Sequence, residues 1–518
     1  MVAVLLCSVV IPLVTGVALL AGDRFSPPVG RRTSYLVALA GAVATAVCVG
    51  LSVWRRPELD HEWVPAIGMR LHLAIDGISA PLLVLTAVLG VLVVLHGHIE
   101  PPSRVGQGTF FGCLLLVTGG AIATFLARDA VLFFLAFEVV LIPMWWLIKG
   151  FGDPAHRAGA AAKFVLYTVL GSTLMLVGIL GMVYLAGTSD IDQLVGGAGM
   201  STSEQTVLAA ILLVGLGIKV PIWPLHSWLP AAHTAAPTTG SVLLAAVLLK
   251  MGTYGVARLV VPTLPDGVDN VAPYVAVLAA IGIIWGGLVC LVERSLKRLI
   301  AWSSIAHMGF VMLGLMSGTR LGLQAALFAN IAHGVVSALL FVVVGGLKHR
   351  WDGDDLTVAR ASLRDTAPRL GFALVIGMAA SLGLPGLAGF WGELLAITST
   401  WSPDSDRPLT LFRVLAAVAA LGTVLAAAYA LRVLRVVWAE GSPAEFAPPE
   451  PAEESEDESA EEPTTDPRLP IVVPDARGIE WLVVGVLVLG TVGLGVLPTI
   501  LLRTTEPDVL QLLGVTGR

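Results

Sequence analysis

The sequence predicts an all-α polytopic membrane protein with about 14 transmembrane helices. Of its 518 residues, 56% are hydrophobic and only 13% are charged, against roughly 25% charged residues in soluble domains. The mean hydropathy is +0.86. Long apolar stretches recur along the chain with short polar loops between them, and a bilayer core about 30 Å thick requires roughly 20 apolar residues per helix.

Each of these apolar stretches is a candidate transmembrane helix. The first is interpreted as an uncleaved span, because no Lys or Arg precedes its apolar run and Arg24 comes only after it. Most of the chain is predicted to lie in the bilayer. The candidate spans are 1–22, 33–53, 76–98, 111–127, 130–149, 162–187, 206–224, 239–260, 272–292, 299–317, 322–347, 370–396, 411–438 and 479–502.

Sequence signatures of catalysis or cofactor binding do not stand out. The four cysteines lie singly in different apolar stretches, which suits neither a disulfide framework nor a zinc or iron–sulfur site. No glycine-rich phosphate loop, dinucleotide fingerprint or nucleophile elbow stands out either. We therefore expect no cofactor, no metal and no nucleic-acid partner on this chain, and no covalent bond made or broken by it.

The distribution of basic residues predicts the orientation in the membrane. The loops after predicted helices 1, 3, 5, 7, 9, 11 and 13 carry 19 Lys and Arg residues, and the opposite loops and termini carry 10. Cytoplasmic loops are enriched in Lys and Arg. Both termini are therefore predicted to face away from the cytoplasm.

Residues 441–470 differ in composition from the rest of the chain. They hold ten acidic residues and many prolines, a composition that buries too little apolar surface to fold. We predict a disordered cytoplasmic loop over 439–478, either a solvated spacer or a docking tail. Without these ten negative charges the net charge of −6 becomes +4, so the acidic balance says nothing about a transport path.

Two charged side chains are predicted near half depth in the membrane, where an unpaired charge is expensive and usually functional. Glu138 lies nine residues into the span 130–149, and Lys250 lies twelve residues into the span 239–260. A buried lysine passes readily between its charged and neutral forms, as a proton relay requires. The alternative for Glu138 is a structural anchor with a fixed basic partner.

Two further charges lie at predicted helix breaks. Lys219 is followed by Pro221 and Pro224, and Glu393 follows Pro385. Proline removes a backbone donor and clashes with the preceding turn. Irregular backbone at membrane depth is tolerated only inside protein or beside a water-filled cavity, so these breaks indicate an internal ion site. The alternative for Lys219 is a side chain that reaches from a helix end to the interface.

The two breaks lie in corresponding parts of the two halves, which indicates inverted repeats with sites at the repeat interface. We predict two inverted five-helix repeats, helices 4–8 and 9–13, with broken helices 7 and 12. The predicted organisation is three N-terminal helices (1–110), a first repeat (111–260), a second repeat (261–438), the acidic loop (439–478) and a C-terminal helix (479–518).

Three histidines, His226, His307 and His333, lie in or beside spans between these charges. A single intramembrane histidine is more often a hydrogen-bonded packing residue. Three of them between two lysines and a glutamate favour a polar chain that crosses the protein. A metal pair of His226 and His233 is disfavoured, because their loop is rich in proline and lacks carboxylate neighbours.

The segment GIKVPIWPLHSWLPAAHTAAPTTGSVLLAAVLLKMGTYG closely resembles the subunit M (chain 4) family of NADH–quinone oxidoreductase, respiratory complex I. That family belongs to the antiporter-like superfamily shared with Mrp sodium/proton antiporters. Further similar blocks are KRLIAWSSIAHMGFV (297–311), ANIAHGVVSALLF (329–341) and GLPGLAGFWGE (383–393).

The resemblance implies fourteen helices, two inverted repeats and a central polar axis. It assigns proton translocation to Glu138, Lys219, Lys250, Glu393, His226, His307 and His333. Glutamate at position 393, where other antiporter-like subunits tend to carry lysine, favours the M type. Ala231 stands where an aspartate is usual, which puts only its local role in doubt, and the acidic insert is unlike the family pattern.

The resemblance implies a subunit of the bacterial cell membrane, with other membrane-arm subunits of complex I as partners. NADH, FMN, iron–sulfur clusters and a quinone are expected in other subunits. In this hypothesis Glu138 and Lys219 form a switchable ion pair. The proton then passes by water and His226 to Lys250, and onward toward Glu393. The alternatives are a stand-alone sodium/proton antiporter subunit, a membrane scaffold, and direct quinone chemistry.

Overall fold

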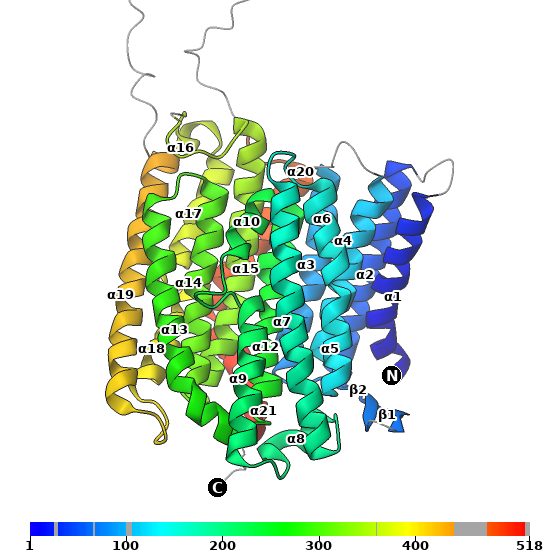
Figure 1. Cartoon of the computed structure of the whole chain (residues 1–518). Helices are drawn as coiled ribbons and strands as arrows, with labels where there is room; N and C mark the ends of the chain where they lie inside the picture. Colours follow the sequence, from blue (N-terminus) through cyan, green and yellow to red (C-terminus); the bar gives the residue numbers. More distant parts are fainter. Residues whose placement is uncertain (25–29, 66–67, 100–105, 359, 440–473, 513–518) are drawn as a thin grey trace, which may run out of the picture.

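The computed structural model describes residues 1–518 except 25–29, 66–67, 100–105, 359, 440–473 and 513–518. Helices make up almost all of the described chain, and most of them run side by side along one direction (Figure 1). Among the described residues, thirteen helices are long and apolar enough to cross a membrane. The prediction of a helical polytopic membrane protein is confirmed. The predicted loop at 439–478 lies mostly outside the described residues.

The N-terminal part contains a small β-hairpin that the all-α prediction missed. Its strands, β1 (Leu59–Val64) and β2 (Met69–Leu73), pair antiparallel. The hairpin is short and rich in charged residues and histidines, so in the sequence it resembles a polar loop between two spans. The helices around it are α1 (Val2–Gly22), α2 (Arg31–Arg55), α3 (Ser79–Ile99) and α4 (Gln107–Leu126).

The next part of the chain is built from short helices as well as long ones. The segment predicted as the eighth span is helical throughout but changes its winding twice, because two π-helical turns flank α12. The elements are α5 (Ala130–Val139), α6 (Leu141–Phe151), α7 (Arg157–Ala186), α8 (Ile191–Leu194), η2 (Val195–Gly197), α9 (Thr202–Lys219), α10 (Trp228–Ala235), α11 (Thr238–Leu243), η3 (Leu244–Leu248), α12 (Leu249–Gly255) and η4 (Val256–Val260).

The remaining elements follow the predicted spans closely until the C-terminus. There the predicted helix 479–502 ends early, at Val496, and Pro498 begins a separate helix. The elements are α13 (Pro265–Val292), α14 (Leu296–Met316), α15 (Arg320–Trp351), α16 (Leu363–Thr366), α17 (Pro368–Ser381), α18 (Ala388–Trp401), α19 (Leu409–Leu434), η5 (Arg435–Ala439), α20 (Gly478–Val496) and α21 (Pro498–Leu512).

Helical structure is interrupted at both places where the sequence analysis placed broken helices. No helix covers 220–227, the segment that separates α9 from α10 and contains Pro221 and Pro224. Residues 382–387, which include Pro385, separate α17 from α18. Neither α17 nor α18 reaches the roughly 20 residues that a bilayer requires. The predicted span 370–396 is therefore absent from the thirteen helices that are long and apolar enough to cross a membrane among the described residues. The inverted relation of the two repeats stays a prediction.

A third interruption was not anticipated. The helix that carries Glu138 ends at Val139, and α6 begins at Leu141. The cause is Pro143, which has no N–H to give and whose ring crowds the carbonyl of Val139 four residues earlier. As a result Glu138, like Lys219, lies beside a helix break.

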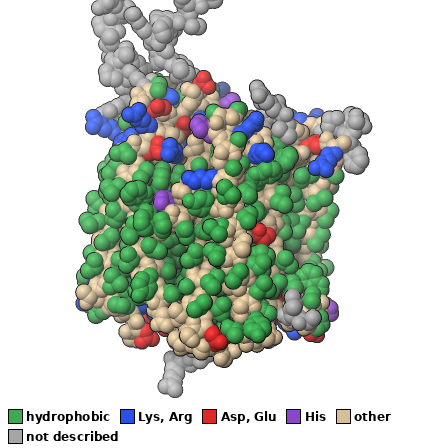
Figure 2. All heavy atoms as spheres, viewed as in Figure 1, with side chains coloured by type: hydrophobic (Ala, Val, Ile, Leu, Met, Phe, Trp, Pro, Cys, Tyr) green, Lys and Arg blue, Asp and Glu red, His purple; other side chains and the backbone are tan. Residues whose placement is uncertain are grey.

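Burial separates a lipid-facing shell from an internal group of helices. Apolar side chains cover the middle of the visible face, and charged side chains gather at its two ends (Figure 2). The share of buried residues in the most apolar 18-residue stretch differs widely from helix to helix. This share is only 28% for α1, but 100% for Thr238–Val260, 94% for α15 and 89% for α14. The polar residues on these three inner helices are therefore surrounded by protein rather than lipid.

Candidate functional site

Lys250 is the most enclosed charged residue of the candidate site. It is fully buried on α12, between the π-helical turns η3 and η4, and such turns are frequent at functional sites. Its Nζ donates to the carbonyl oxygen of Ala245 at 2.6 Å and lies 2.6 Å from Nδ1 of His333 on α15. A charged lysine has only donors, so Nδ1 of His333 accepts from it.

The polar chain continues from His333 to Glu393. The rings of His333 and His307, which lie on α15 and α14, have centroids 5.4 Å apart. His307 Nε2 lies 3.4 Å from Oε1 of Glu393 on α18 and 3.0 Å from the carbonyl oxygen of Ser381. A cavity of about 30 Å³ is lined by both histidines and Glu393, which is room for a water molecule. The structure thus joins four predicted residues from four helices.

The break between α17 and α18 brings backbone against the Glu393 carboxylate. Gly383 has a φ of +76°, and a Cβ added there would lie 2.8 Å from Oε2 of Glu393. Only glycine adopts this conformation without strain and leaves the carboxylate its space. The glycines of GLPGLAGFWGE therefore set the position of the charged group.

Glu138 and Lys219 form a second, separate group. Glu138 accepts a hydrogen bond from the hydroxyl of Ser172 on α7. The Lys219 Nζ lies 4.9 Å from the ring centroid of Phe137 and 5.9 Å from that of Phe164. Among the described residues no ion pair within 4 Å joins Glu138 to Lys219, although their charges interact. The two side chains are therefore apart in the structure.

His226 lies in the break between α9 and α10. Its Nδ1 has no hydrogen-bond partner among the described residues, and its ring centroid lies 5.4 Å from that of Trp302. No hydrogen bond within the described part of the chain joins it to Lys219 or Lys250, so its predicted place between the two lysines stays a prediction. The helices of the two lysines do pack directly, because a Cβ on Gly252 would lie 3.2 Å from Cβ of Lys219.

The sequence reading left out His233, which it considered only for a metal pair. This histidine is fully buried on α10 and stacks on Phe341, with ring centroids 4.6 Å apart and an interplanar angle of 11°. Neither ring nitrogen has a hydrogen-bond partner among the described residues. The charges of Lys250 and Lys297 both act on it. The sequence feature that could have identified His233 as a candidate site residue is its position in an apolar segment, seven residues after His226.

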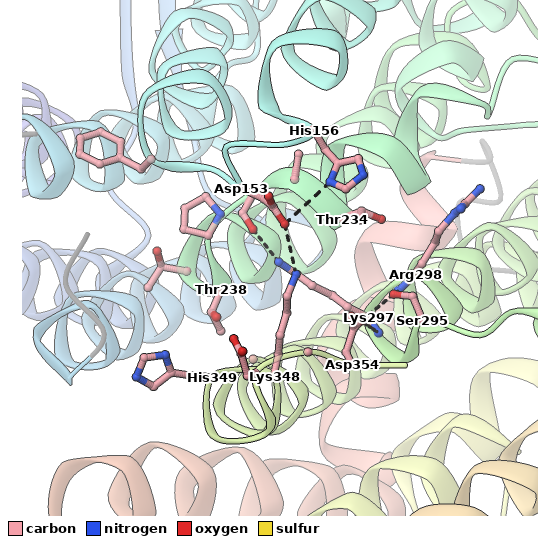
Figure 3. A pocket seen from close by; sticks show the side chains of 18 residues that line it. Asp153, His156, Thr234, Thr238, Ser295, Lys297, Arg298, Lys348, His349 and Asp354 are labelled. Carbon is pink, nitrogen blue, oxygen red and sulfur yellow. Dashed lines mark hydrogen bonds and ion pairs between the residues drawn. The ribbon is translucent and has the colours of Figure 1, made fainter. Parts of the chain in front are cut away.

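A wide polar pocket opens next to His233, at the end of the molecule where α15 ends and α14 begins (Figure 3). Its volume is about 780 Å³, and its lining includes the segment 234–239 and Lys297. Lys297 is 4% exposed and donates to the carbonyl oxygen of Ala236. Lys348 also lines the pocket, and its Nζ lies 3.6 Å from Oδ2 of Asp153. The pocket brings solvent within one residue of His233 along the chain.

At the opposite end of the molecule, Asp76 is buried just before α3 between two arginines. Arg128 contacts its Oδ2 at 2.8 Å, and Arg258 contacts the same oxygen. Burial raises the pKa of Asp76, but the charges of Arg258 and Arg128 outweigh burial and hold that pKa below its ordinary range. This group ties α3 and the α4–α5 connection to η4, eight residues after Lys250.

The fold and the site define a class of protein, a polytopic helical membrane protein with a buried chain of ionisable side chains beside broken helices. A family profile described as NADH:quinone oxidoreductase/Mrp antiporter, TM, matches residues 127–420. This chain belongs to that family.

Curated relatives resemble most of the chain. NADH-quinone oxidoreductase subunit M of Rhodobacter capsulatus is 36% identical over 448 residues, which cover 82% of this chain and 84% of the relative. Subunit M of Escherichia coli K12 is 35% identical over 408 residues, 76% of this chain and 77% of that protein. NAD(P)H-quinone oxidoreductase chain 4 1 of Synechococcus sp. is 40% identical over 383 residues, 73% and 71% of the two chains.

Solved structures share the whole fold. A chain of respiratory complex I from Thermus thermophilus with bound NADH superposes with a TM-score of 0.83 at 27% identity, covering 99% of this chain and 100% of that one. A chain of the Mrp complex from Dietzia sp. superposes with a TM-score of 0.81 at 22% identity, covering 100% and 98%. At 22% identity, the similarity to the Mrp complex chain is evidence for the fold alone.

Proposed function

We propose that this chain is a proton-translocating membrane-arm subunit of an NADH:quinone oxidoreductase. The observation that carries the proposal is the buried chain Lys250–His333–His307–Glu393, in which each group can gain and lose a proton. The family membership and the relatives named subunit M support it.

Proton transfer requires donor and acceptor within hydrogen-bond reach, directly or through one water. Lys250 and His333 meet this condition directly at 2.6 Å. A water in the 30 Å³ cavity completes the step from His333 to His307. His307 then lies 3.4 Å from the carboxylate that ends the chain.

The separated Glu138 and Lys219 supply the switch. A carboxylate close to a buried lysine favours the charged lysine, and its withdrawal favours the neutral one. Movement at the break after Val139 changes this distance, because Glu138 sits on the last turn of α5. The proton released from Lys219 passes toward Lys250 across the packed ends of α9 and α12, by water and His226.

We propose the pocket of Figure 3 as the cytoplasmic access to this chain, by way of Lys297 and His233. The visible face carries its Lys and Arg side chains mainly at its upper end, which the positive-inside rule places in the cytoplasm (Figure 2). Met1 and α21 lie at the lower end (Figure 1). In the bacterial cell membrane, both termini then face away from the cytoplasm.

The driving reaction belongs to other subunits in this proposal. NADH, FMN, iron–sulfur clusters and the quinone are bound there, and their redox chemistry moves neighbouring membrane-arm subunits against this one. The proposal predicts that Lys219→Ala in the assembled complex abolishes NADH-driven proton pumping into reconstituted vesicles. Full coupled pumping by this variant would refute the role of Lys219.

The second candidate function is a subunit of a stand-alone sodium/proton antiporter, which the family description favours because it also names the Mrp antiporter. Purification of the tagged chain separates the two. Co-purification with flavin and iron–sulfur subunits supports the oxidoreductase, and co-purification with membrane subunits alone supports the antiporter.

A further inference from the structure

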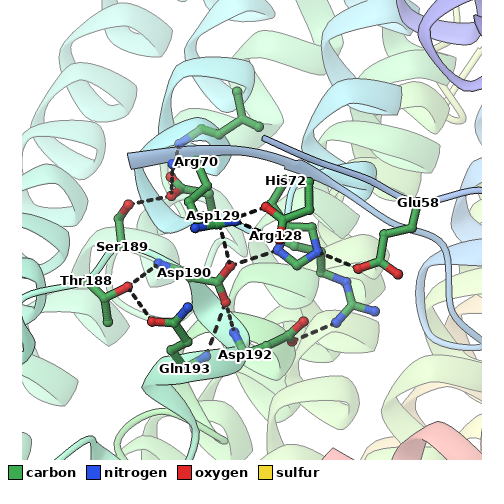
Figure 4. A network of polar contacts seen from close by, with 12 residues as sticks. Glu58, Arg70, His72, Arg128, Asp129, Thr188, Ser189, Asp190, Asp192 and Gln193 are labelled. Carbon is green, nitrogen blue, oxygen red and sulfur yellow. Dashed lines mark hydrogen bonds and ion pairs between the residues drawn. The ribbon is translucent and has the colours of Figure 1, made fainter. Parts of the chain in front are cut away.

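One buried histidine holds the β1–β2 hairpin against the end of the molecule. His72, on β2, is 5% exposed. Its Nδ1 lies 2.8 Å from Oδ2 of Asp190, the residue that caps α8, and its Nε2 lies 3.0 Å from Oε1 of Glu58, just before β1 (Figure 4). The imidazole therefore lies between two carboxylates: Glu58, next to the hairpin, and Asp190, at the start of α8.

This geometry specifies the charge of the ring. An ionised carboxylate has only acceptors, and a neutral imidazole has a single N–H. Burial raises the pKa of Asp190, but the hydrogen bond and charge of His72 and the backbone N–H groups of Gln193 and Asp192 outweigh burial and hold that pKa below its ordinary value, so Asp190 is an ionised acceptor at neutral pH. Both nitrogens of His72 can donate to their carboxylates only when the ring is protonated.

The other charged groups around His72 make their hydrogen bonds to other partners. On the hairpin, Arg70 donates to Asp60 through Nε at 2.7 Å and a second nitrogen at 2.9 Å, and its Nε is 3.9 Å from Asp190. From the α4–α5 connection, the Arg128 guanidinium faces Asp192 and Asp76. The cation between Asp190 and Glu58 is thus His72 itself.

Asp129, from the same connection, completes the set of charged groups at the contact. It accepts from the backbone N–H of Arg70 at 3.0 Å and from the hydroxyl of Ser189. The carbonyl oxygen of His72 accepts from the backbone N–H of Arg128 at 2.9 Å. These two backbone hydrogen bonds form only when the hairpin is docked, so they report docking.

We propose that His72 is a proton-dependent clasp, which fastens the β1–β2 hairpin to the segment that begins α8 when protonated and releases it when neutral. The clasp goes beyond the proposed function and does not rest on it. Burial opposes the charged ring, but the hydrogen bonds to Asp190 and Glu58 and the charges of Asp190 and Asp60 outweigh burial and hold the pKa of His72 above its ordinary value. The stabilisation that His72 gives to the docked hairpin is therefore complete below about pH 6.5 and is lost as the pH rises through the higher pKa of the docked state.

Hydrogen exchange of the intact complex in nanodiscs tests the clasp. The readout is the protection of the Arg70 and Arg128 amides, corrected for intrinsic exchange, from about pH 5.5 to about pH 9, a range that brackets ordinary histidine titration. EDTA is present throughout, because ligand atoms of Asp60, His72 and Asp190 lie within 4.8 Å of one another and could otherwise hold a metal ion. We expect protection to fall about tenfold or more across the titration, the change that one pKa unit of coupling produces.

Three variants decide between a clasp and a merely structural contact. His72→Gln, which cannot become charged, is expected to show low protection at every pH. His61→Gln, on the exposed face of β1, is the matched control and is expected to behave as wild type. Glu58→Gln keeps an acceptor but loses the charge, so its protection at low pH should remain while the midpoint moves to lower pH. A flat wild-type profile, a wild-type profile in His72→Gln, or an unmoved midpoint in Glu58→Gln would each overturn the proposal.

Discussion

The Nζ of Lys250 lies 2.6 Å from Nδ1 of His333, in a part of the molecule where neither side chain meets solvent freely. Two basic groups this close cannot both carry a charge without strong repulsion. A proton on Lys250 therefore disfavours a second proton on His333, and the pair is suited to hold one positive charge on either α12 or α15. The hydrogen bond from Thr253 to Asn330 at 2.8 Å holds the same two helices together one turn away.

The carboxylate of Glu393 is the last group in the proposed series of proton-transfer residues. Neutralising it should stop proton transfer from His307. Glu393→Gln preserves the shape of the side chain but removes the anion 3.4 Å from the imidazole. We expect NADH-driven proton uptake by proteoliposomes containing the assembled complex to fall on the order of 10²-fold, the usual cost of removing a proton-transfer group. Asp406→Asn, in an exposed loop, is the control and should pump normally.

A side chain at position 383 should affect both the stability of the protein and proton pumping. It would strain the backbone and also crowd the Glu393 carboxylate. An alanine at this φ of +76° costs about 1–2 kcal/mol of stability, and its Cβ would lie 2.8 Å from the carboxylate oxygen. We expect Gly383→Ala to lower both the thermal unfolding midpoint and the pumping rate. Gly386→Ala has a comparable φ of +91° with nothing within 4 Å of the added Cβ. It should lower stability alone, and equal pumping defects in the two variants would contradict this explanation.

The close approach of α12 to the end of α9 depends on Gly252. A Cβ at this position would lie 2.9 Å from Cγ2 of Val220 and 3.2 Å from Cβ of Lys219. We expect Gly252→Ala to cost about 1–3 kcal/mol by overpacking and to slow transfer between the two lysines. Gly485→Ala on α20 meets nothing within 4 Å and should be neutral or stabilising by about 0.5–1 kcal/mol. Measuring the thermal unfolding midpoint and the proton uptake of both variants tests these two expectations.

Asp76 should stabilise the folded protein mainly in its ionised form. Asp76→Asn leaves two buried guanidinium groups without their carboxylate, and breaking a buried ion pair costs about 3–5 kcal/mol. Because the pKa of Asp76 is held below its ordinary value, this stability is present above about pH 4 and is lost as the pH falls further. Glu506→Gln removes the exposed pair with Arg320 and should cost at most about 1 kcal/mol. Thermal unfolding of the two variants at neutral pH measures the difference.

Much of this architecture could be predicted because the bilayer leaves few choices. Apolar length located the spans, and the prolines at 221, 224 and 385 located two interruptions. The prolines act locally, so their effect is visible in the sequence. The interruption beside Glu138 has the same cause in Pro143, and a count of residues between the proline and the crowded carbonyl would have found it.

The contacts between side chains were harder to predict, because they depend on how helices distant in sequence pack. No local pattern pairs Lys250 with His333 rather than with His226, since 83 residues separate the first two. His233 was undervalued for the same reason, because its charged neighbours lie on other helices. The β1–β2 hairpin and its clasp were missed because a short polar segment between two spans carries no apolar pattern.

In the proposed function, protons cross this subunit through Lys250. Proteoliposomes containing the assembled complex with Lys250→Met test it most directly, since methionine keeps the length of the side chain and removes its proton. The measurement is the number of protons taken up per NADH oxidised, compared with the wild-type complex under the same conditions. We expect proton uptake to be lost in the variant. A wild-type ratio of protons to NADH in the Lys250→Met complex would contradict it.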